Sequence, residues 1–275
     1  MVSLKGKDIL HGNQFSRKEI DTVLKVALDF EKELKKRDSL PLLKGKILAT
    51  LFFEPSTRTR LSFETAMQRL GGGVISMGSV ESSSVAKGET LTDTVRTVSQ
   101  YADVIVIRHP RIGSAKEAAD AALIPVINAG DGAGQHPTQA LLDIYTIHKE
   151  LGSLKNLAVS MVGDLKYGRT VHALVELLSL FQAKLYFVSP STLRMPEEIT
   201  SNLRGKGIEI VETEDLMEAA SKCDLLYMTR IQKERFEDLS EYERVKGRFV
   251  IDSEFLKKLK NKITILHPLP RVDEI

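Results

Sequence analysis

The sequence predicts an α/β protein of two domains, each with a mainly parallel sheet flanked by helices. Apolar runs of strand length alternate with segments of helical period along the whole chain, a pattern typical of parallel sheets covered by helices. The 275 residues also exceed the usual size of one domain, roughly 100–200 residues, so that each half can bury its own core.

The first half opens with an amphipathic helix over residues 15–36, with Ser16 or Asn13 as its N-cap. Strands and helices then alternate, because short apolar runs are followed by segments of helical period. A longer helix, 136–151, closes this half before Gly152, a residue type that commonly ends helices. The strands are predicted at 47–53, 74–77, 104–107 and 125–128, and the helices between them at 59–70, 91–101 and 115–121.

A second series of alternating strands and helices begins beyond Gly152. We place the domain boundary there, which gives domains 1–151 and 152–275. The Gly-rich run 129–134 lies at a strand-to-helix junction, so we interpret it as a loop beside a site rather than a linker. The second half repeats the alternation, with strands at 157–162, 184–188, 208–211, 224–228 and 263–266 and helices at 170–181, 215–221 and 254–259.

Composition excludes several classes of protein. The formal net charge is +2 with Lys and Glu mixed along the chain, so no nucleic-acid partner is indicated. No apolar run approaches the roughly 18 residues that span a bilayer, and the N-terminus has no apolar signal core, which predicts no membrane partner and a cytoplasmic location. The single cysteine, Cys223, can form no internal disulfide and is a poor start for a zinc site, so we expect a buried apolar residue.

Ligands of open α/β sheets bind outside the carboxyl ends of the strands, so the loops that leave strands are the informative ones. The first such loop, 53–60, combines Ser and Thr hydroxyls, Arg58, Arg60 and a helix N-terminus, which together suit phosphate oxygens. A Ser/Thr-rich turn can equally be a plain helix cap with solvated arginines.

The loops after the strands 104–107 and 125–128 also carry side chains that can donate hydrogen bonds. Arg108 follows the strand 104–107 and could close on the same anion. His136 and Gln139 follow the strand 125–128 and share one helix face, where they could contact a neutral polar group. A lone histidine is more often structural, and that alternative stays open for His136.

Three strand ends of the second half also carry polar residues. The loop 163–170 resembles a nucleotide-binding P-loop but has Arg169 where that motif requires lysine, so no nucleotide triphosphate site is predicted. Cationic residues follow at 230–235. At 267–271, two prolines predict an extended turn with outward carbonyls. The surplus of cations at these loops points to anionic substrates.

The residues at these loops match a known family. Ser-Thr-Arg-Thr-Arg at 56–60, His-Pro-Thr-Gln at 136–139 and His-Pro-Leu-Pro at 267–270 resemble the signature of the aspartate and ornithine carbamoyltransferases. The segments 87–90, 164–170 and 230–235 resemble the aspartate-specific members. An ornithine enzyme is expected to have His-Cys-Leu-Pro near the end, and Pro268 stands in place of that cysteine.

The resemblance implies transfer of a carbamoyl group from carbamoyl phosphate to L-aspartate in pyrimidine biosynthesis, without metal or organic cofactor. It assigns phosphate binding to Ser56, Thr57, Arg58, Thr59 and Arg108. It assigns the carbamoyl oxygen to His136 with Thr59 and Arg108, and the carbamoyl amino group to Gln139 and the backbone of Leu269 and Pro270. The aspartate carboxylates are assigned to Arg169, Arg230 and Gln232, and Glu54 is expected to bridge to Arg169 and Arg235 across the domains.

The resemblance also implies a homotrimer with shared active sites, because Ser83 and Lys87 of the family's flexible loop enter the neighbouring subunit's site. Family members continue past the 270s with a helix that packs back on the first domain, and we expect this helix to be absent, since the sequence ends at Ile275. Whether a regulatory chain associates is open. The rival functions are ornithine carbamoyl transfer and non-catalytic binding of phosphate or nucleotide.

Overall fold

The computed structural model describes residues 2–77, 84–232, 236 and 238–275. The chain divides into two compact units, Met1–Leu141 and Leu142–Ile275. The division falls within helix α5, Pro137–Leu151. The predicted domain boundary near Gly152 follows the end of the same helix and stays a prediction.

The first unit is built on a four-stranded sheet of order β2-β1-β3-β4, in which each neighbouring pair is parallel. Helices connect the strands, as the sequence predicted. The strands are β1 (Ile47–Phe52), β2 (Gly73–Ser76), β3 (Val104–His109) and β4 (Val126–Asp131), and the helices are α1 (Arg17–Leu34), α2 (Thr57–Arg69), α3 (Leu91–Val98) and α4 (Ser114–Ala121).

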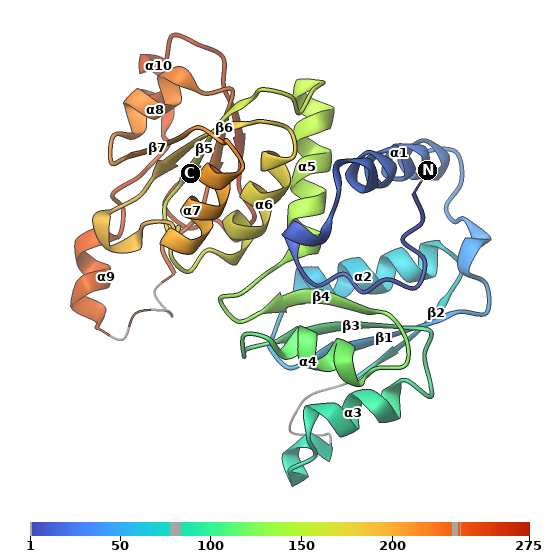
Figure 1. Cartoon of the computed structure of the whole chain (residues 1–275). Helices are drawn as coiled ribbons and strands as arrows, with labels where there is room; N and C mark the ends of the chain where they lie inside the picture. The colour runs from blue at the N-terminus through green and yellow to red at the C-terminus, as the bar shows by residue number, and fades with distance from the viewer. Residues whose placement is uncertain (1, 78–83, 233–235, 237) are drawn as a thin grey trace. The chain divides into compact units, whose positions relative to one another are not determined.

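Both faces of this sheet are covered, as expected for a parallel sheet. Successive residues of β1 point to opposite faces. Leu48 and Phe52 join the cluster that includes Met67 of α2, whereas Ala49 and Leu51 join the cluster that holds Val95 of α3 and two alanines of α4. Figure 1 shows α2 on one side of the sheet and α3 and α4 on the other.

The second unit has a five-stranded parallel sheet of order β7-β6-β5-β8-β9. Cys223 is buried in its core beside residues of β6 and β8, as predicted, and burial raises the pKa of its thiol to about 12. The strands are β5 (Ala158–Val162), β6 (Lys184–Val188), β7 (Ile210–Thr213), β8 (Leu225–Met228) and β9 (Thr264–Leu266), and the helices are α6 (Arg169–Ser179), α7 (Glu197–Gly205), α8 (Leu216–Lys222), α9 (Leu239–Val245) and α10 (Ser253–Lys258).

Two helices of this unit were not predicted. These are α7, which buries Thr200 and Leu203, and α9, which buries Val245. In the first unit, helix α3 was predicted to run to residue 101 but ends at Val98. The hydroxyl of the next residue, Ser99, donates to the Val95 carbonyl at 2.8 Å.

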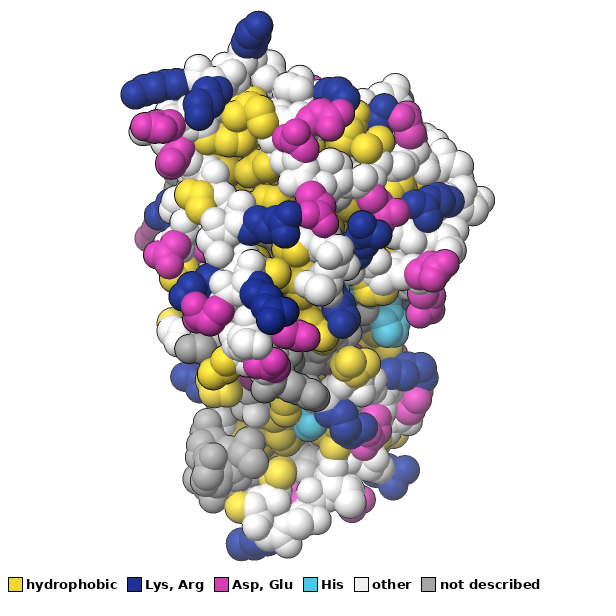
Figure 2. Space-filling view, turned by 90° about the vertical axis from the view of Figure 1, so that its left-hand side faces the viewer, with side chains coloured by type: hydrophobic (Ala, Val, Ile, Leu, Met, Phe, Trp, Pro, Cys, Tyr) yellow, Lys and Arg dark blue, Asp and Glu magenta, His cyan; other side chains and the backbone are white. Residues whose placement is uncertain are grey.

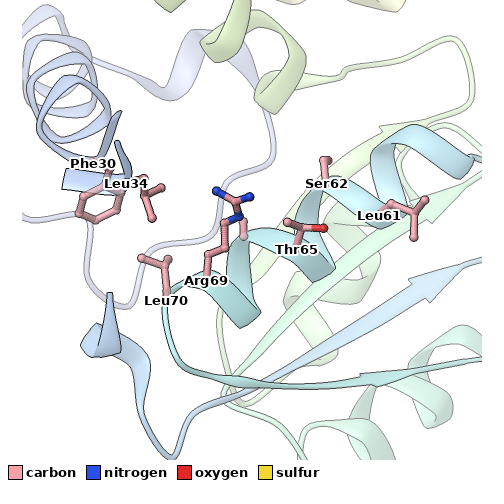
Figure 3. A pocket seen from close by; sticks show the side chains of 8 residues that line it. Phe30, Leu34, Leu61, Ser62, Thr65, Arg69 and Leu70 are labelled. Carbon is pink, nitrogen blue, oxygen red and sulfur yellow. The ribbon is translucent and has the colours of Figure 1, made fainter. Parts of the chain in front are cut away.

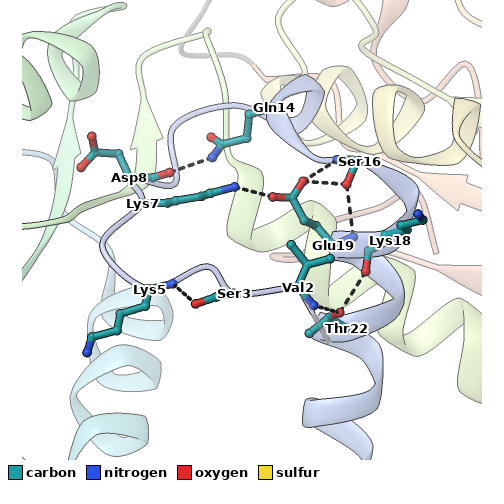
Figure 4. Close-up of polar contacts among 10 residues, drawn as sticks. All are labelled: Val2, Ser3, Lys5, Lys7, Asp8, Gln14, Ser16, Lys18, Glu19 and Thr22. Atoms are coloured by element: carbon teal, nitrogen blue, oxygen red, sulfur yellow. Dashed lines mark hydrogen bonds and ion pairs between the residues drawn. The ribbon is translucent and has the colours of Figure 1, made fainter.

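The N-terminus of α1 confirms one of the two predicted caps. The Ser16 hydroxyl accepts a hydrogen bond from the Glu19 N–H, and the Glu19 carboxylate in turn accepts one from the Ser16 N–H at 2.8 Å. Lys7 donates to the same carboxylate at 2.7 Å, as Figure 4 shows. Glu19 therefore joins the first residues of the chain to the start of α1.

This contact predicts a pH dependence of stability. Hydrogen bonds from Lys7 and Ser16 lower the pKa of Glu19 from 4.5 to about 2. A carboxyl whose pKa is depressed by folding stabilises the protein above its unfolded pKa, and that stabilisation is lost as pH falls toward the folded value. Glu19→Gln should lower the free energy of unfolding at pH 7 by about 1 kcal/mol, and the difference from the parent should shrink between pH 4.5 and 2.

Urea unfolding at a series of pH values measures this difference. Asp29→Asn, which changes an exposed carboxylate on the same helix, is the matched control and should show no such pH-dependent difference. A Glu19→Gln difference that stays constant down to pH 2 would contradict the role of the charged carboxylate.

Helices α1 and α2 also enclose a groove of about 460 Å³. Figure 3 shows Phe30 and Leu34 contributed by α1 and Leu61 and Thr65 by α2. None of its lining residues belongs to the predicted site. They are Phe30, Leu34, Leu61, Ser62, Thr65, Ala66, Arg69 and Leu70.

The described surface agrees with the charge pattern of the sequence, since basic and acidic side chains are interspersed on the face drawn in Figure 2. Across the described ranges, every helix is too short or too polar to cross a membrane. The same residues contain no group of three or more His, Cys, Asp or Glu side chains arranged to hold a metal ion.

Candidate active site

Three of the predicted loops of the first unit lie at one edge of its sheet. Strands β1, β3 and β4 are adjacent and parallel, so their carboxyl ends meet at the same edge. Phe52 at the end of β1 is in register with Arg108 of β3, and His109 is in register with Asp131 of β4. The sheet therefore gathers the loop 53–56, Arg108 and the segment that leads to His136.

The first loop ends where α2 begins. Ser56 is the N-cap residue, yet its side chain makes no capping hydrogen bond, in contrast to Ser16 at the start of α1. The free side chain of Ser56 is therefore available to a ligand, and the anion site at this loop stays a prediction. Helix α2 starts two residues earlier than predicted, so Thr57 and Arg58 belong to its first turn, where N–H groups favour an anion. Both side chains are exposed.

Arg108 is held in place from two sides. Its Nη2 donates to Glu54 Oε1 at 3.2 Å, and its Nη1 donates to the Ala129 carbonyl at 3.4 Å. The Arg108 side chain is only 11% exposed, so the ion pair lies largely out of water, where a charge needs its partner. Glu54, predicted to bridge to Arg169 and Arg235, thus has a partner in its own unit, and the bridge stays a prediction.

The loop before His136 is organised by the buried side chain of Asp131. One carboxylate oxygen accepts the Gln135 N–H at 2.8 Å, and the other accepts the Gly113 N–H at 3.0 Å. His136 itself is buried and stands directly before α5, where its carbonyl accepts from the Gln139 N–H at 3.1 Å. The helix predicted at 136–151 thus begins one residue later, at Pro137, so His136 precedes its first turn, and a shared helix face for the His136 and Gln139 side chains stays a prediction.

The segment expected from the neighbouring subunit is described only in part. Lys87 ends a short 3-10 helix, Ser84–Lys87, and is exposed. Ser83 lies outside the described residues.

In the second unit, the loop after β5 is tightly constrained. Asp164 is fully buried and accepts the Tyr167 N–H at 2.9 Å, and His172 contacts the Leu165 carbonyl at 2.8 Å through Nε2. Gly168 is the N-cap residue of α6, which places Arg169 in the first position of that helix. A helix N-terminus and a guanidinium thus meet at one end of the loop.

The loop after β8 lies beside it, because β5 and β8 are neighbours in the sheet. Thr229 donates both its N–H and its hydroxyl to the Val162 carbonyl, at 2.8 and 2.9 Å. Gln232 donates to the Tyr167 carbonyl at 3.5 Å, so the two loops contact each other. Arg230 is half-buried and lies between Thr229 and Gln232 in sequence, and Arg235 lies outside the described residues.

The third loop of this unit follows β9. The Leu269 N–H donates to His267 Nδ1 at 2.8 Å, and His267 Nε2 contacts Glu274 at 2.8 Å. Burial lowers the pKa of His267, in keeping with a neutral ring that accepts at Nδ1. The turn is not extended throughout as predicted: Leu269 has φ of 62°, because its N–H closes a tight turn on the His267 ring.

Reasoning from sequence missed the residues that hold these loops. Asp131, Asp164 and Thr229 make the hydrogen bonds described above, and all three are buried. Only position could have indicated them, since each lies at the end of a strand or directly after one. The Tyr227 hydroxyl donates to Asp143 Oδ2, and this pair carries no such signal, because the two residues lie within β8 and α5.

Together the loops offer anions two sets of donors, one on each unit. The first set has hydroxyls, two guanidiniums, an imidazole and an amide, and the second has two guanidiniums and an amide. Such donors bind phosphate and carboxylate groups and stabilise an oxyanion as it forms.

Comparisons with known proteins agree with this chemistry. Residues 7–149 match the family model "Aspartate/ornithine carbamoyltransferase, carbamoyl-P binding domain", and residues 155–275 match "Aspartate/ornithine carbamoyltransferase, Asp/Orn binding domain". The aspartate carbamoyltransferase catalytic subunit of Thermococcus kodakarensis is 57% identical over 98% of this chain and 87% of its own length.

Two solved structures of Trypanosoma cruzi aspartate transcarbamoylase are also similar, each 45% identical. The complex with carbamoyl phosphate and aspartate has a TM-score of 0.93 and covers 98% of this chain and 88% of the other. The complex with N-(phosphonacetyl)-L-aspartic acid has a TM-score of 0.94 and covers 100% of this chain and 88% of the other.

Proposed function

Because this chain belongs to the aspartate/ornithine carbamoyltransferase family, we infer that it transfers the carbamoyl group of carbamoyl phosphate to the amino group of L-aspartate. The products are N-carbamoyl-L-aspartate and phosphate, and the reaction belongs to de novo pyrimidine biosynthesis. The observation that carries the inference is the presence of two anion-binding donor sets at strand ends, one on each unit.

The second donor set favours aspartate over ornithine. Arg169 and Arg230 are two cations at adjacent strand ends, and Gln232 adds an amide. The two carboxylates of aspartate suit such a set, whereas the ammonium of an ornithine side chain would be repelled by it.

The first set takes carbamoyl phosphate. We assign the phosphate to Ser56, Thr57, Arg58, Thr59 and Arg108. We assign the carbamoyl oxygen to His136 with Thr59 and Arg108, and the carbamoyl amino group to Gln139 and the backbone of Leu269 and Pro270. The exposed first turn of α2 supports the phosphate assignment, because its N-cap side chain makes no capping bond that would compete with an anion.

The reaction needs no protein nucleophile, because the aspartate amine attacks the carbamoyl carbon itself. The only cysteine is buried with a raised thiol pKa, which is consistent with this. Collapse of the tetrahedral intermediate breaks the bond between carbon and the phosphate oxygen, and the leaving phosphate accepts the amine proton. Positioning two reactants contributes about 7–11 kcal/mol, and donors aimed at the oxyanion contribute about 3–4 kcal/mol.

The proposal extends to assembly. We propose a homotrimer with shared active sites, in which Ser83 and Lys87 of a neighbouring subunit complete the site. The exposure of Lys87 is consistent with a role toward a second chain. We also propose that residues 1–151 bind carbamoyl phosphate and residues 152–275 bind aspartate. Glu54 bridges to Arg169 and Arg235, and the protein is cytoplasmic.

An assay of both amino acids with carbamoyl phosphate tests the function. Phosphate release and ureido product should appear with L-aspartate, and the kcat/KM for L-ornithine should be lower by on the order of 10⁴-fold, because its side chain leaves the carboxylate-binding donors unpaired. N-(phosphonacetyl)-L-aspartate should inhibit the reaction in competition with carbamoyl phosphate.

Two outcomes would overturn the proposal. Preference for ornithine would make the chain the other kind of transferase in its family. Binding of the analogue without turnover of either amino acid would make it a non-catalytic phosphate binder.

A further inference from the structure

A single buried hydroxyl joins three elements of the second unit. Tyr227 of β8 has no exposed surface, and its hydroxyl donates to Asp143 Oδ2 of α5 at 2.7 Å. The side chain of Thr170, the second residue of α6, lies close enough to interact with the same hydroxyl.

Packing alone does not explain this arrangement. A phenylalanine would fill the space of the Tyr227 ring, and apolar replacements for two buried hydrogen-bonded partners are often neutral or stabilising. Instead the core holds a phenol and a carboxylate, both buried. Such a network holds its side chains in one arrangement. Any other arrangement would leave a buried polar group without a hydrogen-bond partner, which costs free energy.

Two of the joined elements lead directly to residues assigned to aspartate. Tyr227 stands three residues before Arg230 on the same strand end. Thr170 follows Arg169 at the start of α6. Asp143 lies on the part of α5 that belongs to the second unit.

We propose that Tyr227 is a positioning residue for carbamoyl transfer, whose hydroxyl fixes Arg169 and Arg230 relative to each other and to helix α5. The inference rests on the proposed function. The hydroxyl acts by holding the aspartate-binding guanidiniums at one spacing, so that the aspartate carboxylates are bound with the amine in its reactive orientation.

The hydroxyl does not itself exchange protons in the reaction. Burial, the Asp143 charge and the hydrogen bond to Asp143 raise the pKa of Tyr227 well above 10. The phenol therefore stays protonated at the pH values at which the enzyme works, which leaves a geometric role.

The test compares Tyr227→Phe with the parent in steady-state kinetics. The variant should show a roughly 10–100-fold lower kcat/KM for aspartate, because a misplacement of about 1 Å costs on that scale. Its KM for carbamoyl phosphate should stay within about twofold of the parent, and the shape of its pH profile should not change.

Tyr186→Phe is the matched control, since it removes the hydroxyl of another buried tyrosine of the same sheet, in β6. Tyr186→Phe should leave the kcat/KM for aspartate and the KM for carbamoyl phosphate unchanged. If Tyr227→Phe does not fold, Thr170→Val tests the same network at a half-buried position and should also raise the KM for aspartate.

The inference is wrong if Tyr227→Phe folds and its aspartate kinetics match those of Tyr186→Phe, or if both substrates lose affinity equally. Where Tyr227→Phe does not fold, an unchanged KM for aspartate in Thr170→Val is the contrary result. A parent chain that does not carbamoylate aspartate at all would refute the proposed function instead, so the two failures are distinguishable.

Discussion

Arg58→Ala should lower the turnover of carbamoyl phosphate and aspartate by on the order of 10²–10³-fold, the loss typical when one donor to a developing anion is removed. Arg58 lies in the first turn of α2, at the carboxyl edge of the four-stranded sheet, and its side chain is exposed. The free energy of unfolding should therefore stay within about 0.5 kcal/mol of the parent.

The control is Arg69→Ala, which makes the same chemical change in the last turn of the same helix. Arg69 is also exposed and lines the groove between α1 and α2, away from the assigned residues. Its kcat and both KM values should match those of the parent. Stopped-assay kinetics and thermal unfolding of the three proteins provide the comparison, and unchanged turnover in Arg58→Ala would remove this residue from the site.

Much of the fold can be predicted from the sequence, because its strands and helix caps are marked by residues close together in the chain. Strand-length apolar runs predict β1, β3 and β5 close to their observed bounds, and Ser16 is recognisable as a cap because Glu19 follows three residues later. Helix α7 was missed although local signals mark its start, since Pro196 is its N-cap residue and Glu197 and Glu198 stand in its first turn.

The candidate site is predictable to the extent that it lies at strand ends. The order of the loops along the chain, combined with the rule that ligands bind at the carboxyl ends of parallel strands, is enough to expect Ser56, Arg108 and His136 at one edge of a sheet. Hydrogen bonds between residues remote in sequence cannot be predicted in this way. The pair Tyr227–Asp143 and the contact of Arg108 with Glu54 depend on the register of packed elements, which no local pattern records.

Gly163 illustrates a constraint that only the structure shows. It follows β5 with φ of 112°, a conformation that residues with a Cβ rarely adopt. A Cβ at this position would lie 2.2 Å from the carbonyl oxygen of Thr229, the residue before Arg230. The ends of β5 and β8 approach so closely that only glycine fits between them.

Gly163→Ala should therefore destabilise the protein by at least about 2 kcal/mol, with a Tm lower by roughly 5–10 °C. Where the protein still folds, the displaced Thr229 carbonyl should move Arg230 and raise the KM for aspartate by more than about tenfold, because the carboxylate-binding donors are then misplaced. Calorimetry and aspartate saturation kinetics measure the two effects.

The matched control is Gly205→Ala at the end of α7, where a Cβ would meet no atom within 4 Å. Alanine is the better helix former by up to about 1 kcal/mol, so this variant should be as stable as the parent or slightly more so. If Gly163→Ala were as stable and as active as Gly205→Ala, the close approach of β5 and β8 would not be a requirement of the site, and the position of Arg230 would have to be set by other contacts.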